Sequence, residues 1–427
     1  MRVPDWKQAE QTSASAITVD DVEFRSLYTK TRYLVDTADG WSLSITRYRP
    51  KPQVFPQPLL GEPMLLVHGF SQNRHTWTSG QFVKNLLFFG IDIHILELRG
   101  HGNSSIELQH ERAQKFGRPL PADIDYGWDI DSYFLYDLPA AVSGVKRITR
   151  RDRIFYCGHS MGGMLGYGYA GIHDDFEGIV TIGAASDIGA GVLFLRAISL
   201  AGPLMLGGLD GLLAAANLER KAVHKGRALL AKAAGVVSND LKKRLAPDGA
   251  PEDWRFTNVP VDWFLKQLEH QLGRAENFPA FHKLLVRLNR LSNMSRVSSA
   301  DIRWLLREGG SPEPRGVIEQ FARWIRNGEL VCYRTGYDFK RGFSKIDVPM
   351  AIIFGDMDPL ASVRSTRSVY RAAQSEYLLW RPVKGNSHIE LTMGHDIRQI
   401  CYDVKNLVEY ARSHRHKRPS LPRRDGR

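Results

Sequence analysis

The chain has 427 residues, of which 43% are hydrophobic and 24% charged, and its net charge is +12. This length exceeds that of one small domain, so we expect two to three structural units around a sizeable core. The three cysteines, Cys157, Cys332 and Cys401, lie far apart. Their spacing excludes a disulfide framework and a zinc site and fits a reducing compartment.

The first predicted elements are two strands over residues 28–35 and 41–48, joined by the turn residues 38–40. The later strands are short apolar runs without alternation, separated by helical lengths. This pattern indicates a mainly parallel sheet that is buried on both faces. The runs are residues 64–67, 91–96, 153–157, 178–182, 350–354 and 377–380. Helical spacing predicts a crossover helix over 126–149 and a final helix over about 396–412.

Between residues 187 and 345 the strand pattern is absent and helical spacing continues throughout, with breaks at glycines and prolines. We therefore expect an inserted helical cap over 187–345 between two parts of an α/β core, 1–186 and 346–412. A basic, disordered tail is expected over 413–427, because seven basic residues and one acid lie between Ala411 and Arg427. Contact of this tail with anionic lipid or nucleic acid is the alternative.

The predicted cap contains an apolar stretch over 192–216 and a basic stretch over 219–245. The pair could lie on an anionic membrane or lipid surface, or the apolar part could pack on the core beneath a solvated basic face. The longest charge-free apolar part, 197–209, is shorter than the roughly 20 residues of a membrane span. Residues 1–8 contain no signal-peptide segment. We expect a cytoplasmic protein without a transmembrane helix, with peripheral membrane contact left open.

The pattern G-x-S-x-G occurs at Gly158, Ser160 and Gly162, after a predicted strand and before a helical stretch over 163–169. A sharp strand-to-helix turn needs glycines on both sides because the backbone is crowded there, and it exposes the serine hydroxyl above the sheet. This context predicts that Ser160 is a nucleophile, with Gly158 and Gly162 supporting the turn. A turn that only packs a helix against a strand is the alternative.

His68, Gly69 and Phe70 follow the predicted strand over 64–67. After such an elbow, an oxyanion hole takes one backbone N–H from this kind of loop and one from the residue after the nucleophile. We therefore expect the N–H groups of Phe70 and Met161 to be the donors. His68 and Gly69 are expected to support the loop.

A nucleophilic serine needs a base, and the base needs an acid that orients it, in the chain order Ser, Asp, His for this type of elbow. Asp356 and Asp358 follow the strand over 350–354, and His388 follows the strand over 377–380. We choose Asp358, which lies deeper in its loop, with Asp356 in reserve. For the base we prefer His388 to His395, which falls near the start of the final helix.

These motifs together resemble those of the α/β-hydrolase superfamily. Residues 99–104 are similar to the R-G-H-G-x-S loop that follows the fourth strand in many members. Three further segments are similar to the acid lipases of gastric and lysosomal type. They are Y-D-L-P-A at 136–140, Q-x-x-x-W at 320–324 with Gly328 and Tyr333, and Ser387-His388-Ile389-Glu390 in the place of their N-H-L-D.

The resemblance implies an α/β-hydrolase fold with a mainly parallel central sheet, flanking helices and a helical cap. It also assigns Ser160, Asp358 and His388 as the triad and implies hydrolysis of lipid esters. Two features depart from the family. The chain has Met161 where acid lipases usually have Gln, and it lacks the signal peptide of those secreted enzymes. These departures leave the substrate and the compartment open.

We expect a serine hydrolase that cleaves carboxylic, lipid-like esters through an acyl-enzyme, without a metal or organic cofactor. The expected partner is a small-molecule or lipid ester. Two alternatives remain, an acyltransferase on the same scaffold and a binding protein that has lost catalysis. The intact Ser, Asp and His positions argue against the second. No nucleic-acid partner is expected, because no aromatic-interleaved binding module accompanies the basic tail.

Overall fold

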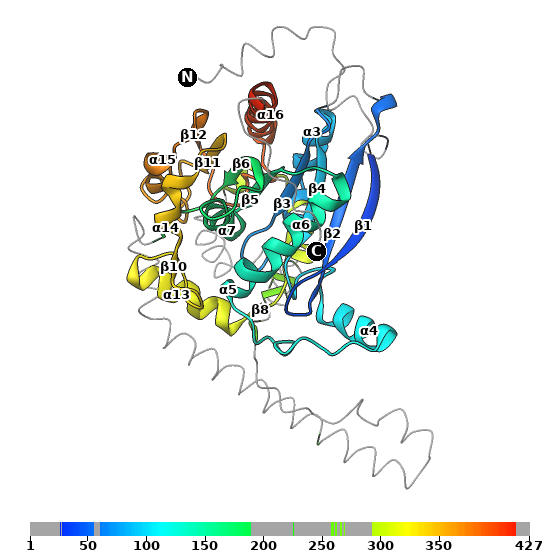
Figure 1. The fold of residues 1–427 in the computed structure, drawn as a ribbon. Helices are drawn as coiled ribbons and strands as arrows, with labels where there is room; N and C mark the ends of the chain where they lie inside the picture. The colour runs from blue at the N-terminus through cyan, green and yellow to red at the C-terminus, as the bar shows by residue number, and fades with distance from the viewer. Residues whose placement is uncertain are drawn as a thin grey trace, which may run out of the picture.

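The computed structural model describes Ser26 and residues 28–54, 60–188 and 293–415, with a few positions between 225 and 269. Its centre is an eight-stranded sheet in the order β1-β2-β4-β3-β5-β6-β11-β12 (Figure 1). β1 pairs with β2, and β2 with β4, in antiparallel orientation. From β4 to β12 all neighbouring strands are parallel. The mainly parallel sheet expected from the sequence is therefore confirmed.

Each strand predicted from an apolar run is present, with ends that shift by a few residues. The strands β3 to β6 and β11 are buried along their whole length, as unalternating apolar runs require. The bounds are β1 Tyr28–Asp36, β2 Ser42–Pro50, β3 Pro63–Val67, β4 Asp92–Glu97, β5 Ile154–His159, β6 Phe176–Ile182, β11 Met350–Gly355 and β12 Leu378–Val383.

Helices cover both faces of the sheet (Figure 1). α3 (Phe82–Phe88) and α16 (Ile397–His414) pack on one face, and α6 (Leu138–Thr149) and α7 (Met161–Ala170) on the other. Side chains of β3 alternate between the two cores, because Leu65 packs with one cluster and Leu66 with the other.

The short helices are α2 His75–Thr78, α5 Ile130–Ser132, α14 Phe339–Gly342 and α15 Arg367–Ala372, and α4 spans Ile106–Phe116. Single 3-10 turns occur at Pro52–Val54, Met294–Arg296 and Phe343–Lys345.

The crossover helix begins later than predicted. It starts with α5 at Ile130, passes through a π-helical turn at Tyr133–Asp137 and continues as α6. Asp129 has an extended backbone, and its side chain accepts a hydrogen bond from the N–H of Ser132. An extended residue with such a hydrogen bond marks the N-terminal end of a helix. Residues 126–129 therefore form a loop before α5.

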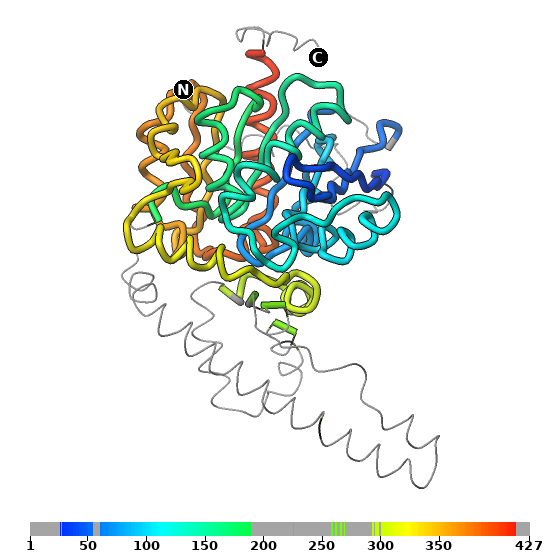
Figure 2. The backbone as a smooth tube through the Cα atoms, turned by 60° about the horizontal axis from the view of Figure 1, so that its bottom comes forward, coloured from blue at the N-terminus to red at the C-terminus, as the bar shows by residue number. Residues whose placement is uncertain are grey.

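The prediction that 187–345 is helical throughout is wrong for its last part. α12 (Ser299–Glu308) and α13 (Arg315–Asn327) are separated by β8 (Glu313–Pro314), which pairs with β7 (Asn258–Val259). A second short pair joins β9 (Val331–Cys332) to β10 (Tyr337–Asp338). Strands of two residues are too short to show a periodicity in the sequence. Figure 2 shows α13 (yellow) and, seen end-on, α12 (yellow-green) at one edge of the described part of the chain.

The two unusual stretches predicted to form part of the cap, 192–216 and 219–245, lie outside the described residues except for position 225. The final helix runs beyond its predicted end at residue 412, to His414. Arg415 then pairs with Glu62 and Glu177, both of them buried, so the first three residues of the predicted tail are ordered. The remainder of the tail, 416–427, lies outside the described residues. In the described part of the chain, no helix has the length and apolar character needed to cross a membrane.

Candidate active site

Ser160 lies at the turn between β5 and α7. Its backbone has φ 51° and ψ −118°, a region that non-glycine residues rarely adopt. The turn is crowded, because a Cβ on Gly158 would lie 2.5 Å from the backbone of Gly162. A Cβ on Gly162 would lie 2.4 Å from the carbonyl oxygen of Val67. The two glycines thus allow β5, α7 and the end of β3 to meet at the serine.

The loop after β3 lies directly beside this serine. A Cβ on Gly69 would be 2.9 Å from the Cβ of Ser160. The side-chain oxygen of Gln72 accepts hydrogen bonds from the N–H of Gly69 (2.9 Å) and from Nδ1 of His159 (3.0 Å). The loop is therefore fastened to the residue that precedes the serine.

His68, at the start of this loop, is fully buried. Its Nδ1 faces the carbonyl oxygen of Gly69 at 2.9 Å, and its Nε2 faces the N–H of Leu98 at 3.2 Å. One nitrogen donates and the other accepts, which is the pattern of a neutral ring. Burial, together with the neighbouring His101, holds the pKa of His68 well below its ordinary value.

Two backbone N–H groups at the serine have no partner. In the described part of the chain, neither the N–H of Phe70 nor that of Met161 makes a hydrogen bond. The Met161 group belongs to the first residue of α7, where intrahelical acceptors do not exist and the helix dipole is positive. Such groups are suited to an anion. The N–H of Gly69, by contrast, is occupied by Gln72.

Asp358 and His388 form a buried pair. Nδ1 of His388 lies 2.8 Å from Oδ2 of Asp358, and both side chains are buried. The second oxygen of Asp358 accepts the N–H groups of Leu360 and Ala361 at 2.7 and 2.9 Å. The acid is therefore held by three contacts. Since Nδ1 is engaged, Nε2 of His388 is the nitrogen that could act as a base.

The competing candidates lie elsewhere. Asp356 is exposed and accepts a hydrogen bond from the N–H of Gly385. His395 is exposed, and its N–H donates to the carbonyl of Arg296. Neither side chain contributes to the buried pair formed by Asp358 and His388.

His388 contacts His159, the residue that precedes the serine. The two imidazole rings are 4.8 Å apart, and Nε2 of His159 lies 3.3 Å from the carbonyl oxygen of His388. Among the described residues Ser160 and His388 share no hydrogen bond. Such contacts are often long in the absence of substrate and tighten when it binds.

The pKa values of the pair are shifted in opposite directions. Burial favours the neutral ring of His388, but the charge and hydrogen bond of Asp358 outweigh burial and raise its pKa above 6.5. Burial also opposes ionisation of Asp358, but the interaction with His388 and the two backbone N–H groups lower its pKa. Burial and the neighbouring His388 lower the pKa of His159 to about 3. The site thus contains one ring with a raised pKa, that of His388, and one with a lowered pKa, that of His159.

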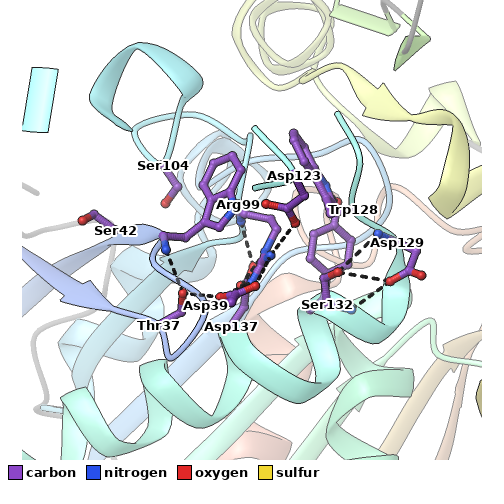
Figure 3. A network of polar contacts seen from close by, with 12 residues as sticks. Thr37, Asp39, Ser42, Arg99, Ser104, Asp123, Trp128, Asp129, Ser132 and Asp137 are labelled. Atoms are coloured by element: carbon purple, nitrogen blue, oxygen red, sulfur yellow. Dashed lines mark hydrogen bonds and ion pairs between the residues drawn. The ribbon is translucent and has the colours of Figure 1, made fainter. Parts of the chain in front are cut away.

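Two motifs of the sequence meet in a polar network around Arg99 (Figure 3). Arg99, which is fully buried, donates to Asp39, Asp123 and Asp137 at distances of 2.7 to 3.0 Å. Its own backbone N–H also donates to Asp137. The R-G-H-G loop is therefore joined to the start of α6, where the Y-D-L-P-A segment lies.

The Q-x-x-x-W segment also has a structural place. Gln320 accepts the N–H of Ile130 and donates to Asp131, so it joins α13 to α5. Trp324 is buried and donates to the carbonyl of Val331. Gly328 ends α13 with φ 64°, a conformation typical of the residue after a helix.

Sequence reasoning missed two residues near the serine, Gln72 and Glu313. Gln72 lies three residues after Gly69 and could have been found as part of the loop. Glu313 is fully buried and contacts the N–H of Ser71 across 242 positions of the chain. No local pattern connects positions so far apart.

Comparisons with known proteins agree with this geometry. Residues 62–231 match the family model described as the alpha/beta hydrolase fold. Human lipase member M is 29% identical over 142 residues, which is 32% of this chain and 31% of the relative. Human lysosomal acid lipase/cholesteryl ester hydrolase is 26% identical over 149 residues, 32% of this chain and 33% of the relative. The chain thus spans about a third of the length of the curated relatives that it matches.

Solved structures were also found to be similar. A bacterial membrane phospholipase A aligns over 90% of this chain and 87% of its own, with 16% identity and a TM-score of 0.47. A protein of Burkholderia cenocepacia described as a "putative aryl esterase" aligns over 90% of this chain and 100% of its own. Its identity is 14% and its TM-score 0.48.

The strand order, the strand-to-helix elbow and the matched family model define the class. The chain has the α/β-hydrolase fold. The curated relatives further confirm the resemblance to lipases of the acid type that the motifs indicated.

Proposed function

We propose that the protein is a serine hydrolase that cleaves carboxylic, lipid-like esters through an acyl-enzyme. One observation carries the proposal. A buried, hydrogen-bonded Asp358–His388 pair lies against His159, the residue that precedes a serine held at φ 51° on a strand-to-helix turn. A serine with a base and an orienting acid in this chain order has the parts of an acyl-transfer site. The curated relatives, which are lipases by name, support an ester substrate.

In the proposed mechanism, Nε2 of His388 accepts the proton of Ser160 as the hydroxyl oxygen attacks the acyl carbonyl. Asp358 holds the ring through Nδ1 and stabilises the imidazolium that forms. The ring then donates its proton to the leaving alcohol. Water, activated by the same nitrogen, attacks the acyl-enzyme, and the acid product leaves.

The oxyanion of each tetrahedral intermediate would be bound by the N–H groups of Phe70 and Met161. Among the described residues neither group makes a hydrogen bond, and the Met161 N–H directly follows Ser160 and begins a helix. A single donor of this kind contributes about 10²- to 10³-fold in turnover. We further propose that residues 187–345 form a cap above this site.

The test compares three proteins, the wild type, Ser160→Ala and Ser344→Ala. Ser344 is exposed and distant in sequence from the site, so its variant controls for the loss of a hydroxyl. We expect the wild type and Ser344→Ala to hydrolyse a chain-length series of p-nitrophenyl esters and to react with a fluorophosphonate probe. Ser160→Ala should lose both activities, with turnover lower by at least about 10⁴-fold.

Two results would contradict the proposal. Ester hydrolysis by Ser160→Ala near the wild-type rate would remove Ser160 as the nucleophile. Labelling of the wild type at Ser160 without hydrolysis of any ester would instead indicate an acyltransferase, in which an alcohol or thiol intercepts the acyl-enzyme.

A further inference from the structure

A buried carboxylate that the proposed mechanism does not use lies behind the loop that carries Phe70. Glu313 belongs to β8, between α12 and α13, and its side chain is fully buried. A buried charge is costly unless hydrogen bonds and opposite charge compensate it. The contacts of Glu313 therefore indicate what it stabilises.

The first contact is with the loop itself. Oε1 of Glu313 accepts the backbone N–H of Ser71 at 2.5 Å. Ser71 has φ 58°, a left-handed conformation that a non-glycine residue keeps only when its surroundings hold it. Ser311, two residues before Glu313, exchanges two further bonds with Ser71. Its N–H donates to the carbonyl of Ser71 at 2.9 Å, and its carbonyl accepts the Ser71 hydroxyl at 2.6 Å.

These bonds restrain the peptide units on both sides of the Phe70 donor. The N–H of Ser71 belongs to the peptide that follows Phe70, and Glu313 holds it. The N–H of Gly69 belongs to the His68–Gly69 peptide, which precedes the peptide that carries the Phe70 N–H. It donates to the side-chain oxygen of Gln72. The direction of the Phe70 N–H is then determined by two neighbouring peptides that cannot rotate freely. Orientation matters because an oxyanion donor acts only when it points at the developing charge.

The second contact supplies the compensating charge. His101 is fully buried, its Nδ1 faces the carbonyl oxygen of Arg99 at 2.8 Å, and its Nε2 faces Oε1 of Glu313 at 3.2 Å. Both ring nitrogens face acceptors, so both donate only when the ring is a cation. The hydroxyl of Tyr133 donates to the other oxygen of Glu313 at 3.2 Å. The carboxylate is thus held in one position by Ser71, His101 and Tyr133.

We propose that Glu313 is a positioning residue that holds the Phe70 N–H in the orientation required for oxyanion binding. The inference rests on the proposed function, since it concerns the same site. Glu313 does not contact Ser160 and takes no part in proton transfer. Its effect passes through Ser71 to the donor, and the segment between α12 and α13 is thereby coupled to catalysis.

The experiment measures kcat and KM for a p-nitrophenyl ester with Glu313→Gln, Glu313→Ala and Glu319→Gln. Glu319 is exposed on α13 and pairs with Arg315, so its variant removes a carboxylate without touching the loop. We expect kcat to fall about 10-fold for Glu313→Gln, which keeps an acceptor, and about 10²-fold for Glu313→Ala, which does not. KM should stay within about 3-fold, because the donor acts in the transition state. Glu319→Gln should resemble the wild type.

A second readout separates positioning from a general loss of structure. A trifluoromethyl ketone forms a tetrahedral adduct with the serine and places an oxyanion in the hole. Its inhibition constant should rise in proportion to the fall in kcat/KM for both Glu313 variants, while the folded fraction, measured by circular dichroism, stays the same. Wild-type kcat and wild-type ketone inhibition in a folded Glu313→Gln would overturn the inference.

If neither Glu313 variant folds, Tyr133→Phe decides the question. It keeps the ring and removes the hydroxyl, which donates to the carboxylate and accepts the indole N–H of Trp128. A fall in kcat of a few fold at constant KM supports the inference, and unchanged kcat overturns it. Activity in Ser160→Ala would refute the proposed function. Inactive Ser160→Ala together with fully active Glu313→Gln would refute only the positioning of Phe70.

Discussion

At the scale of single residues, the site depends on how burial and charge are balanced at His388. Burial alone would favour a neutral ring, and the carboxylate of Asp358 reverses this effect. Glu390, two positions later, is also fully buried, and like Asp358 it raises the pKa of His388. Its Oε1 accepts the N–H groups of Ser387 and Asn293 at 2.5 and 2.8 Å. This residue therefore holds the loop that carries His388 and adds to the rise in the pKa of its ring.

The pH dependence of ester hydrolysis follows from these shifts. A base must be unprotonated to act, so kcat/KM should fall as the pH is lowered through the pKa of His388, which lies above 6.5. Glu390→Gln removes a negative charge that favours the protonated ring, and the acidic limb of the profile should therefore move to lower pH. The measurement is kcat/KM against pH.

Glu409→Gln is the matched control for this prediction. Glu409 is exposed on α16 and pairs with Lys405, so its removal should leave the acidic limb where it is. A limb that moves to higher pH in Glu390→Gln, or does not move, would show that Glu390 does not act on the base through its charge.

At the scale of elements, the molecule is joined by buried polar contacts between segments that are distant in the chain. Arg99, in the loop after β4, connects the hairpin between β1 and β2 with the start of α6 through Asp39 and Asp137. Guanidinium groups suit this role because their donors are fixed in a plane and can bind several carboxylates at once. The pairing also explains why the R-G-H-G and Y-D-L-P-A segments occur together.

Removal of this arginine should destabilise the fold. Arg99→Met leaves the fully buried carboxylate of Asp137 without its cation, which we expect to lower the free energy of unfolding by about 3 to 5 kcal/mol. Arg307→Met, on the exposed side of α12 where Arg307 pairs with Glu308, should cost less than about 1 kcal/mol. Urea denaturation measures both changes. Equal effects of the two substitutions would contradict a structural role for the Arg99 network.

At the scale of the whole molecule, the chain end that follows the last helix is tied to the middle strands of the sheet. Arg415, just after α16, binds Glu62 ahead of β3 and Glu177 in β6 at 2.8 Å each. The basic residues of this region are therefore not all available to a partner. The basic residues that could meet an anionic surface lie in the stretches 219–245 and 416–427. The whole chain has a net charge of +12.

We propose that the protein makes peripheral contact with anionic lipid surfaces, and this proposal has its own test. The protein should sediment with vesicles that contain phosphatidylserine more than with phosphatidylcholine vesicles, and high salt should release it, because screening weakens such attraction. A chain ending at residue 415 is the matched variant, since it keeps the pairs of Arg415 and removes the basic tail. Sedimentation that is independent of lipid charge and of salt would contradict the proposal.

The sequence alone determined the features that depend on neighbouring residues. Continuous apolar runs predicted the buried strands, glycines on both sides of Ser160 predicted the elbow, and chain order restricted the acid and the base to two candidates each. These signals are local because a strand, a turn or a helix forms from adjacent residues.

The tertiary structure decided the features that depend on contacts between distant residues. It placed Asp358, and not Asp356, against His388, and it brought Glu313 to the loop of Phe70 across 242 positions. It also showed that Arg99 joins two motifs which the sequence presents separately. A buried carboxylate or guanidinium is compensated by whatever partner the fold brings near it, and no periodicity or spacing along the chain records that partner.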